Sequence, residues 1–395
     1  MNKSTLLKSP EEEERSARLV REVEAHLARQ QKYPSDMGFS PLQDKFCEGA
    51  QVKAPWLAGY LSYRDIHGDE NFTRTQFLEY FAAAGADSSD QADRCRGALL
   101  GLALGDTLGV PLEFSQRDVK TVSGIEGGGP FKLAPGYWTD DTSMACCLAY
   151  SLITCRGFDP AHQMQCYCHW YRYGAYSPTG NCFDIGNATR AALERFLQTG
   201  EVYAGSDAAQ SAGNGSLMRL APVPVYYFDS FENAVHYSGL SSQTTHKAIE
   251  TIDACRYFGA LIHGALHGVS KERLLTGLYS PVKGYWEAHP LTASIEAVAL
   301  GSYKIKSRNE ISSSGYVAHT LEAALWAFHH HDTFRDGVLA AVNLADDSDT
   351  VGAVFGQLAG AYFGETALPI EWLLKMHATQ GFYHFAQDLK LASHP

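Results

Sequence analysis

Two short acidic clusters carry the side chains of this sequence that are best suited to chemistry. Residues 138–142 read WTDDT and residues 346–350 read DDSDT, so each cluster combines carboxylates with a threonine hydroxyl and runs into an apolar, helix-like segment. One such cluster can simply begin a helix, because Asp and Thr side chains accept hydrogen bonds from the free N–H groups of a first turn. Two clusters that converge can instead bind a cation that prefers oxygen ligands, such as Mg²⁺ or Mn²⁺. The residue types alone leave both interpretations open.

Three further polar motifs interrupt the apolar pattern. Glu113 lies in the sequence PLEF, either as a surface residue at a helix end or as a carboxyl group whose raised pKa suits acid–base catalysis. Asp184, in NCFDIG, either caps the helix that follows it or belongs to a site. Residues 211–219 read SAGNGSLMR, which is either an ordinary turn or a set of backbone N–H groups that bind phosphate oxygens. The Gly-Lys-Ser/Thr of a Walker loop is missing.

The elements that must position these motifs are predicted to be α-helices. From Cys95 onward, Ala and Leu recur at helical spacing, and alternating β-branched residues are scarce. Two segments carry a glycine at every fourth residue, which places a bare stripe along one face of each helix. Each glycine costs a helix up to about 1 kcal/mol relative to alanine, so we expect these two helices to approach closely at the centre of a compact bundle. The stripes are Gly97, Gly101, Gly105 and Gly109, and Gly352, Gly356, Gly360 and Gly364.

Composition excludes several classes of function. The chain has 395 residues, 45% of them hydrophobic and 19% charged, which is typical of one large globular domain or two ordinary ones. A formal net charge of −12 argues against nucleic acid as the main partner. No uncharged apolar run reaches the roughly 18 residues of a membrane span, and the N-terminus lacks a secretory signal. Nine cysteines without C-x-x-C spacing indicate reduced thiols and a cytoplasmic protein.

Taken together and in this order, the motifs resemble those of the ADP-ribosylglycohydrolase family, which includes hydrolases of the dinitrogenase-reductase-activating type. The resemblance implies an all-α orthogonal helical bundle over residues 91–395, with a site for two Mg²⁺ or Mn²⁺ ions. It implies a hydrolase that removes ADP-ribose from modified protein side chains, with arginine as the expected acceptor and serine-linked or free ADP-ribose derivatives as alternatives. Residues 242–264 also resemble the family's central helix. The matching motifs are residues 96–106, 111–114, 138–144, 183–186, 213–219 and 343–350.

The resemblance also implies roles for single residues. Glu113 would act near the scissile bond, and Asp184 would be a second acidic residue beside the ribose. The implied metal ligands are Thr139, Asp140, Asp141, Asp347, Asp349 and Thr350. The implied substrate contacts are Phe183, Gly186, Gly213, Asn214, Gly215, Ser216 and His246.

Residues 1–90 lie outside the resemblance. They include a charged, helix-like segment over residues 10–31 and an aromatic stretch with prolines over residues 33–63. This extension is either an accessory subdomain packed on the bundle or an interaction arm. Some bacterial relatives resemble immunity proteins that erase the modification and also insert an N-terminal extension into the cleft of an ADP-ribosyltransferase toxin. The expected partners are therefore an ADP-ribosylated protein substrate and, for the arm, such a toxin.

Overall fold

The computed structural model describes residues 89–393, apart from the side chain of Gln380, and these residues form a helical bundle with no β-strand among them. The predicted all-α fold is confirmed. The expectations for residues 1–88 lie outside the described part of the chain. The α-helices are α5 (Asp90–Gly109), α6 (Asp140–Cys155), α7 (Pro160–Tyr173), α8 (Asn187–Thr199), α9 (Pro222–Tyr226), α10 (Phe231–Gln243), α11 (Ile249–Leu266), α12 (Lys271–Leu274), α13 (Tyr285–Ala288), α14 (Ala293–Ala299), α15 (Val317–His330), α16 (Phe334–Val342), α17 (Ser348–Phe363), α18 (Ile370–Leu373) and α19 (Thr379–Ser393).

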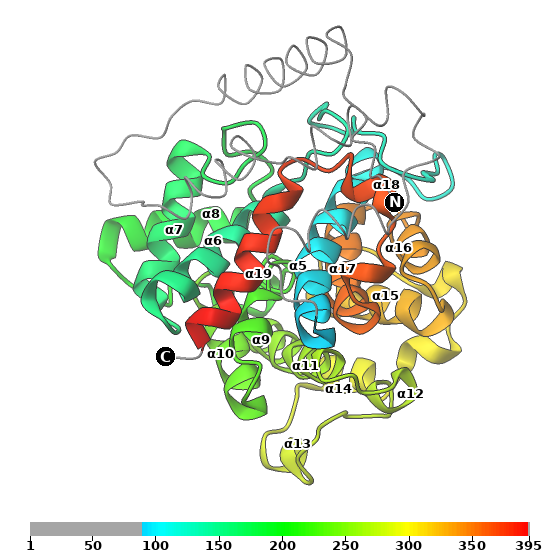
Figure 1. The fold of residues 1–395 in the computed structure, drawn as a ribbon. Coiled ribbons are helices and arrows are strands. Elements are labelled where there is room, and N and C mark those ends of the chain that lie inside the picture. The colour runs from blue at the N-terminus through cyan, green and yellow to red at the C-terminus, as the bar shows by residue number, and fades with distance from the viewer. Residues whose placement is uncertain (1–88, 394–395) are drawn as a thin grey trace, which may run out of the picture. The chain divides into compact units, whose positions relative to one another are not determined.

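Helices α5 and α17 pack against each other along their glycine stripes, and Figure 1 shows them side by side in the middle of the described helices. A Cβ atom added to any of the first three glycines of either stripe would overlap the carbonyl oxygen of the glycine that faces it, whereas the last glycines, Gly109 and Gly364, face Asp349 and Asp93. Only glycine permits this separation, so the predicted close approach is confirmed. The register is antiparallel, with Gly97 facing Gly360, Gly101 facing Gly356 and Gly105 facing Gly352.

The end of this helix pair places two of the predicted site residues together. Gly109, the last residue of α5, packs on the backbone of Asp349 in the first turn of α17. A short 3₁₀ turn, Val110–Leu112, follows α5 and leads directly into Glu113. The glycine contact therefore fixes Glu113 beside the start of α17.

The remaining helices surround this pair. In Figure 1, α6, α7 and α8 lie on one side of it and α15 and α16 on the other. Helix α19 packs against both α5 and α6. Aromatic side chains fill much of the interior, and Trp138, at the entrance to α6, is 1% exposed. None of the helices in the described part is long and apolar enough to cross a membrane.

The central helix expected over residues 242–264 is found as α11, but its predicted first part, over residues 244–248, is wrong. Helix α10 ends at Gln243 and α11 begins at Ile249, so residues 244–248 form a break. The Thr251 hydroxyl donates to the carbonyl of Ala248 at 2.7 Å and to that of His246 at 3.1 Å, which satisfies carbonyls of the break. Consequently His246 lies in a turn between two helices and not on a helix face.

Candidate active site

A buried carboxylate of α5 organises the first acidic cluster. Asp106 accepts hydrogen bonds from the backbone N–H and the hydroxyl of both Thr139 and Thr142, at 2.6–3.2 Å. It thereby satisfies N–H groups at the start of α6, where the side chain of the cap residue itself makes no such bond. Burial raises the pKa of Asp106 to about 6, although the four hydrogen bonds oppose the rise. Helix α6 is therefore capped from another helix, which leaves its own carboxylates free for other partners.

Two threonine hydroxyls join the first acidic cluster to the second. The hydroxyl of Thr139 lies 3.3 Å from Oδ2 of Asp141 and 3.3 Å from Oδ2 of Asp349. The hydroxyl of Thr350 lies 3.4 Å from the same oxygen of Asp141. Thr139 and Asp347 occupy the cap positions of α6 and α17, yet neither side chain accepts a bond from a backbone N–H of its own helix. Both clusters therefore begin helices, as one alternative predicted, but their side chains do not cap the helix N–H groups, and the two clusters converge.

Glu113 and Asp184 meet the second cluster at the same place. One carboxylate oxygen from each of Glu113, Asp184 and Asp349 lies within 4.8 Å of the other two. Glu113 is 5% exposed and Asp349 is 2% exposed. Unpaired carboxylates at this distance and depth repel one another strongly. The arrangement is stable only if protons or cations reduce the negative charge.

Burial and mutual repulsion raise the pKa values of the carboxyl groups in this cluster. Burial, together with the charges of Asp184, Asp347 and Asp141, raises the pKa of Glu113 well above its ordinary range. Burial likewise raises the pKa of Asp184 to about 7, while its hydrogen bond to Glu113, which requires a proton on one of the two carboxyl groups, opposes the rise. The pKa values of Asp140 and Asp349 are raised by the same two causes, burial first and neighbouring carboxylates second.

Asp184 reaches the cluster through an unusual backbone conformation. Its φ of 57° is in the left-handed region, which non-glycine residues adopt uncommonly, although Asp does so more often than most. The cap of α8 is Gly186, and no side chain caps this helix, so the alternative of Asp184 as a helix cap is wrong. Phe183 is half-buried, with its ring centroid 5.2 Å from that of Phe131. Gly186 is exposed, with open space where a Cβ would lie.

The Gly213–Ser216 loop lies beside the second cluster. The side-chain amide of Asn214 donates to Oδ2 of Asp347 at 2.8 Å and to the hydroxyl of Thr320 at 2.9 Å. The Ser216 hydroxyl is buried and shares a hydrogen bond of 2.7 Å with Ser242, away from solvent. Within the described residues no acceptor takes the backbone N–H groups of Gly215 and Ser216. The loop offers free N–H donors, but it does not open a helix, because α9 begins only at Pro222.

A buried arginine fixes the ring of His246 against this loop. Arg219 donates to the carbonyl of Gly215 at 2.9 Å and to the hydroxyl of Thr245 at 2.6 Å. Because a guanidinium group only donates, the Thr245 hydroxyl directs its own proton to Nδ1 of His246, 2.9 Å away. This arrangement assigns the ring proton to Nε2, on the side of Gly213 and Gly215. Burial and the charge of Arg219 lower the pKa of His246 to about 3, so the ring is neutral.

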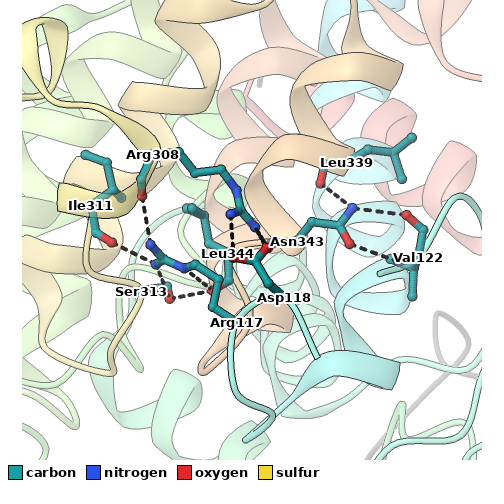
Figure 2. A network of polar contacts seen from close by, with 9 residues as sticks. All are labelled: Arg117, Asp118, Val122, Arg308, Ile311, Ser313, Leu339, Asn343 and Leu344. Carbon is teal, nitrogen blue, oxygen red and sulfur yellow. Dashed lines mark hydrogen bonds and ion pairs between the residues drawn. The ribbon is translucent and has the colours of Figure 1, made fainter. Parts of the chain in front are cut away.

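Figure 2 shows the network that holds the segment after Glu113 against the segment before Asp347. Arg117 donates from its guanidinium group to backbone carbonyls of Leu344, Arg308 and Ile311. The side chain of Asn343 joins the backbone N–H and carbonyl of Val122, at 2.9 and 3.0 Å. The acidic site is therefore braced from outside by side chains that do not enter it.

The donor set of the acidic site fits divalent cations. Glu113 Oε2, Asp141 Oδ1 and Asp349 Oδ1 are buried oxygens without a hydrogen-bond partner in the described part of the chain. Buried polar atoms are almost always satisfied, so three such oxygens in one cluster call for an additional partner. Carboxylate and hydroxyl oxygens are the ligands that Mg²⁺ and Mn²⁺ prefer.

Sequence reasoning gave no role to Asp106, Arg117 and Arg219. Asp106 could have been found, because it is a charged residue inside an otherwise apolar, glycine-striped helix. Arg219 lies within the motif that drew attention to the loop, but its burial and its bond to Thr245 depend on residues far along the chain. Arg117 has no sequence pattern, since its partners are mostly backbone carbonyls.

Comparison with known proteins agrees with this geometry. The family model for ADP-ribosylglycohydrolase matches residues 87–394. ADP-ribosylarginine hydrolase Tri1 of Pseudomonas putida (strain GB-1) is 46% identical over 297 residues, which cover 75% of this chain and 78% of that protein. The protein of the same name from Serratia proteamaculans (strain 568) is 41% identical over 301 residues, with coverages of 76% and 80%. The ADP-ribosyl-(dinitrogen reductase) glycohydrolase of Rhodospirillum rubrum is 29% identical over 289 residues, with coverages of 72% and 90%.

A solved structure has the same fold. It is described as an ADP-ribosylglycohydrolase-related protein complex and matches with a TM-score of 0.68 at 41% sequence identity. The match covers 77% of this chain and 99% of the other. The chain belongs to the ADP-ribosylglycohydrolase family.

Proposed function

We propose that this hydrolase cleaves the N-glycosidic bond between ADP-ribose and modified arginine side chains of proteins, with two divalent cations, Mg²⁺ or Mn²⁺, in the acidic site. The observation that carries the proposal is the set of buried, unpartnered carboxylate oxygens around Glu113. The choice of arginine is supported by two relatives, 46% and 41% identical, that are named ADP-ribosylarginine hydrolases.

The cations would be held by side chains of both acidic clusters. These are Thr139, Asp140, Asp141, Asp347, Asp349 and Thr350. Bound there, divalent cations would offset the negative charge and polarise the ribose hydroxyl oxygens of the substrate. Asp106 and Asn214 would orient these ligands, because the first fixes Thr139 and the second fixes Asp347.

The catalytic step follows from the proton in the hydrogen bond between Glu113 and Asp184. Cleavage at C1″ of the ribose builds oxocarbenium character, and it requires a base for the attacking water and a proton for the leaving guanidine nitrogen. A pair of carboxyl groups that holds one proton can meet both needs. We assign the acid–base role to Glu113, which takes a proton from the attacking water as its own proton passes to the leaving guanidine nitrogen, and Asp184 accepts its hydrogen bond.

The ADP part of the substrate would lie on the Gly213–Ser216 loop. The free N–H groups of Gly215 and Ser216 and the Nε2 proton of His246 would donate to diphosphate oxygens. Asn214 would connect this loop to the metal ligands through Asp347. Phe183 and Gly186 flank Asp184 and would line the ribose side.

The proposal is tested by incubating the protein with arginine-linked and serine-linked ADP-ribosyl proteins and with free ADP-ribose derivatives, with Mg²⁺ and with a chelator. We expect metal-dependent release of ADP-ribose from the arginine linkage. Release from the serine-linked protein alone would identify serine, and not arginine, as the acceptor. Release from the free derivatives alone would exclude a modified protein side chain as the substrate. Undiminished release in the chelator would refute the role of the cations.

A second function, inhibition of an ADP-ribosyltransferase toxin by residues 1–90, is proposed on sequence alone. It is supported by the aromatic stretch with prolines over residues 33–63, and a boundary near residue 90 is supported by the family match, which begins at residue 87. The eight cysteines of the described part are all free, which supports a cytoplasmic location. Full-length protein should capture a cognate transferase, whereas a variant starting near Asp93 should not; equal capture by both would contradict the arm.

A further inference from the structure

We propose that Arg117 is a positioning residue for Glu113: its guanidinium group clamps the segment that carries Glu113 onto the segment that carries Asp347. The inference rests on the proposed function insofar as Glu113 is the catalytic base. It concerns a residue that does not itself enter the acidic site.

The first observation is the number of backbone groups that Arg117 joins (Figure 2). Nε donates to the carbonyl of Leu344 at 3.0 Å, Nη1 to that of Arg308 at 2.7 Å, and Nη2 to that of Ile311 at 2.7 Å. Nη2 also lies 3.4 Å from the hydroxyl of Ser313, which in turn donates to the Leu344 carbonyl at 3.2 Å. One side chain thus fixes three segments that are separated by up to about 230 residues in sequence.

The second observation is that the backbone next to Glu113 is hydrogen-bonded to the backbone next to Asp347, at a crossing of the two segments that the Arg117 contacts hold in place. The backbone N–H of Phe114 donates to the carbonyl of Asp346 at 2.7 Å, and the N–H of Asp346 donates to the carbonyl of Ser115 at 3.0 Å. The N–H of Asp347 donates to the carbonyl of Ser313 at 3.1 Å. Glu113 is therefore attached, through the backbone, to the residue before Asp347.

The third observation is that the crossing is strained on both sides. Phe114 has φ of 56°, Ala345 of 60° and Asp346 of 61°, all in the left-handed region that non-glycine residues avoid. Phe114 is 69% exposed, so packing of its ring does not hold this conformation. Strained residues persist only when the surrounding structure determines them. Arg117 lies three residues after Phe114 and donates to the carbonyl of Leu344, next to Ala345, so its contact joins the two strained segments at their nearest point, while Asn343 joins them farther away at Val122.

Arginine is suited to this task and lysine is not. Its planar group places donors in a fixed fork, so that Nε, Nη1 and Nη2 reach separate carbonyls at once. An ammonium group at the same place would reach a subset of them and would keep the charge without the geometry. Without the clamp, the strained segments relax, the Phe114–Asp346 contact opens, and Glu113 moves away from Asp349 and Asp184. A displacement of about 1 Å can reduce catalysis about 10²-fold.

The direct measurement is backbone hydrogen exchange, which does not depend on activity. In Arg117→Ala and Arg117→Lys we expect faster exchange of the Phe114, Asp346 and Asp347 amides, with unchanged exchange in α11. The matched control is Asp118→Asn, which removes the exposed Arg308–Asp118 ion pair of the same network but keeps every Arg117 contact. Unchanged exchange of these amides in both Arg117 variants, or equal acceleration in Asp118→Asn, would overturn the inference.

Kinetics separate positioning from a general loss of structure. We expect Arg117→Lys to lower kcat for ADP-ribosyl-arginine about 10²-fold with little change of KM, because ADP-ribose contacts lie on the Gly213–Ser216 loop. Guanidinium added to Arg117→Ala, far below denaturing concentration, should restore part of kcat. A rise in KM alone, or no rescue in folded Arg117→Ala, would contradict the clamp. Inactivity of the wild-type protein would refute the proposed function instead, and the exchange result would still decide on the clamp.

Discussion

Replacing Asp349 with asparagine should stabilise the metal-free protein while abolishing its response to metal. Asp349 is 2% exposed, and its carboxylate lies within 4.8 Å of carboxylate oxygens of Glu113 and Asp184. At an effective dielectric constant of about 20, two unit charges at this distance repel each other by about 3.5 kcal/mol. An amide removes the charge and nearly preserves the size and shape of the side chain. Metal binding therefore requires a carboxylate that destabilises the metal-free protein.

The effect depends on pH with a definite sign. Burial and neighbouring carboxylates raise the pKa of Asp349 in the folded protein, so the folded state retains a proton that the unfolded state loses above about pH 4. The stability of the metal-free wild type is greatest below that pH and falls as the pH rises towards the folded-state pKa. The asparagine variant has no carboxyl group at this position and therefore does not lose this part of its stability as the pH rises. The free energy of unfolding of the variant should exceed that of the wild type by little near pH 5 and by about 2–3 kcal/mol near pH 8.5. The larger value is most of the repulsion between two carboxylates at this distance.

Urea unfolding in a chelator, at both pH values, measures this difference. Adding Mg²⁺ or Mn²⁺ at about 100 times its dissociation constant should then stabilise the wild type by about 2.7 kcal/mol and the variant by much less. The exposed residue Asp118 provides the control, since Asp118→Asn should give no gain at high pH. The reasoning is refuted if Asp349→Asn is less stable than the wild type in chelator near pH 8.5, or if metal stabilises both proteins equally.

Two further substitutions test the packing and the substrate loop. Gly356→Ala places a methyl group into the carbonyl oxygen of Gly101 and should lower the free energy of unfolding by at least about 3 kcal/mol in urea unfolding. Gly186→Ala, in open space at the cap of α8, should lower it by about 1 kcal/mol or less. Equal effects would contradict the close approach of α5 and α17. Gly215→Ala brings a methyl group within 2.7 Å of the ring of His246 and should weaken ADP-ribose binding about tenfold in calorimetry, which corresponds to about 1.4 kcal/mol; unchanged affinity would remove the loop from the binding site.

The fold was predictable where a local sequence pattern has a physical cost that only one kind of packing offsets. A glycine at every fourth residue of two helices has a cost that only close packing offsets, and the structure pairs the first three glycines of one stripe with the first three of the other. The convergence of the acidic clusters was implied by the resemblance of the ordered motifs to the ADP-ribosylglycohydrolase family, whereas the composition of the clusters left it open. Composition alone also allowed the cluster side chains to cap their own helices. The N–H groups of α6 are instead bonded by Asp106, which lies outside both clusters.

The part that could not be predicted depends on contacts between distant segments. Asp106 caps α6 across about 33 residues of chain, so the local cap pattern of WTDDT was misleading. The break after Gln243 depends on the hydroxyl of Thr251 bonding carbonyls within it. Arg117 binds backbone carbonyls, which every residue possesses, so no sequence pattern marks its partners.

The central claim is that Glu113, within the carboxylate cluster, performs the hydrolysis. The most direct measurement is the release of ADP-ribose from an arginine-linked ADP-ribosyl protein by the wild type and by Glu113→Gln, both with saturating Mg²⁺. The amide keeps the size of the side chain but cannot accept a proton, so we predict a rate at least about 10²-fold lower at similar KM. Release by Glu113→Gln at the wild-type rate would contradict the account.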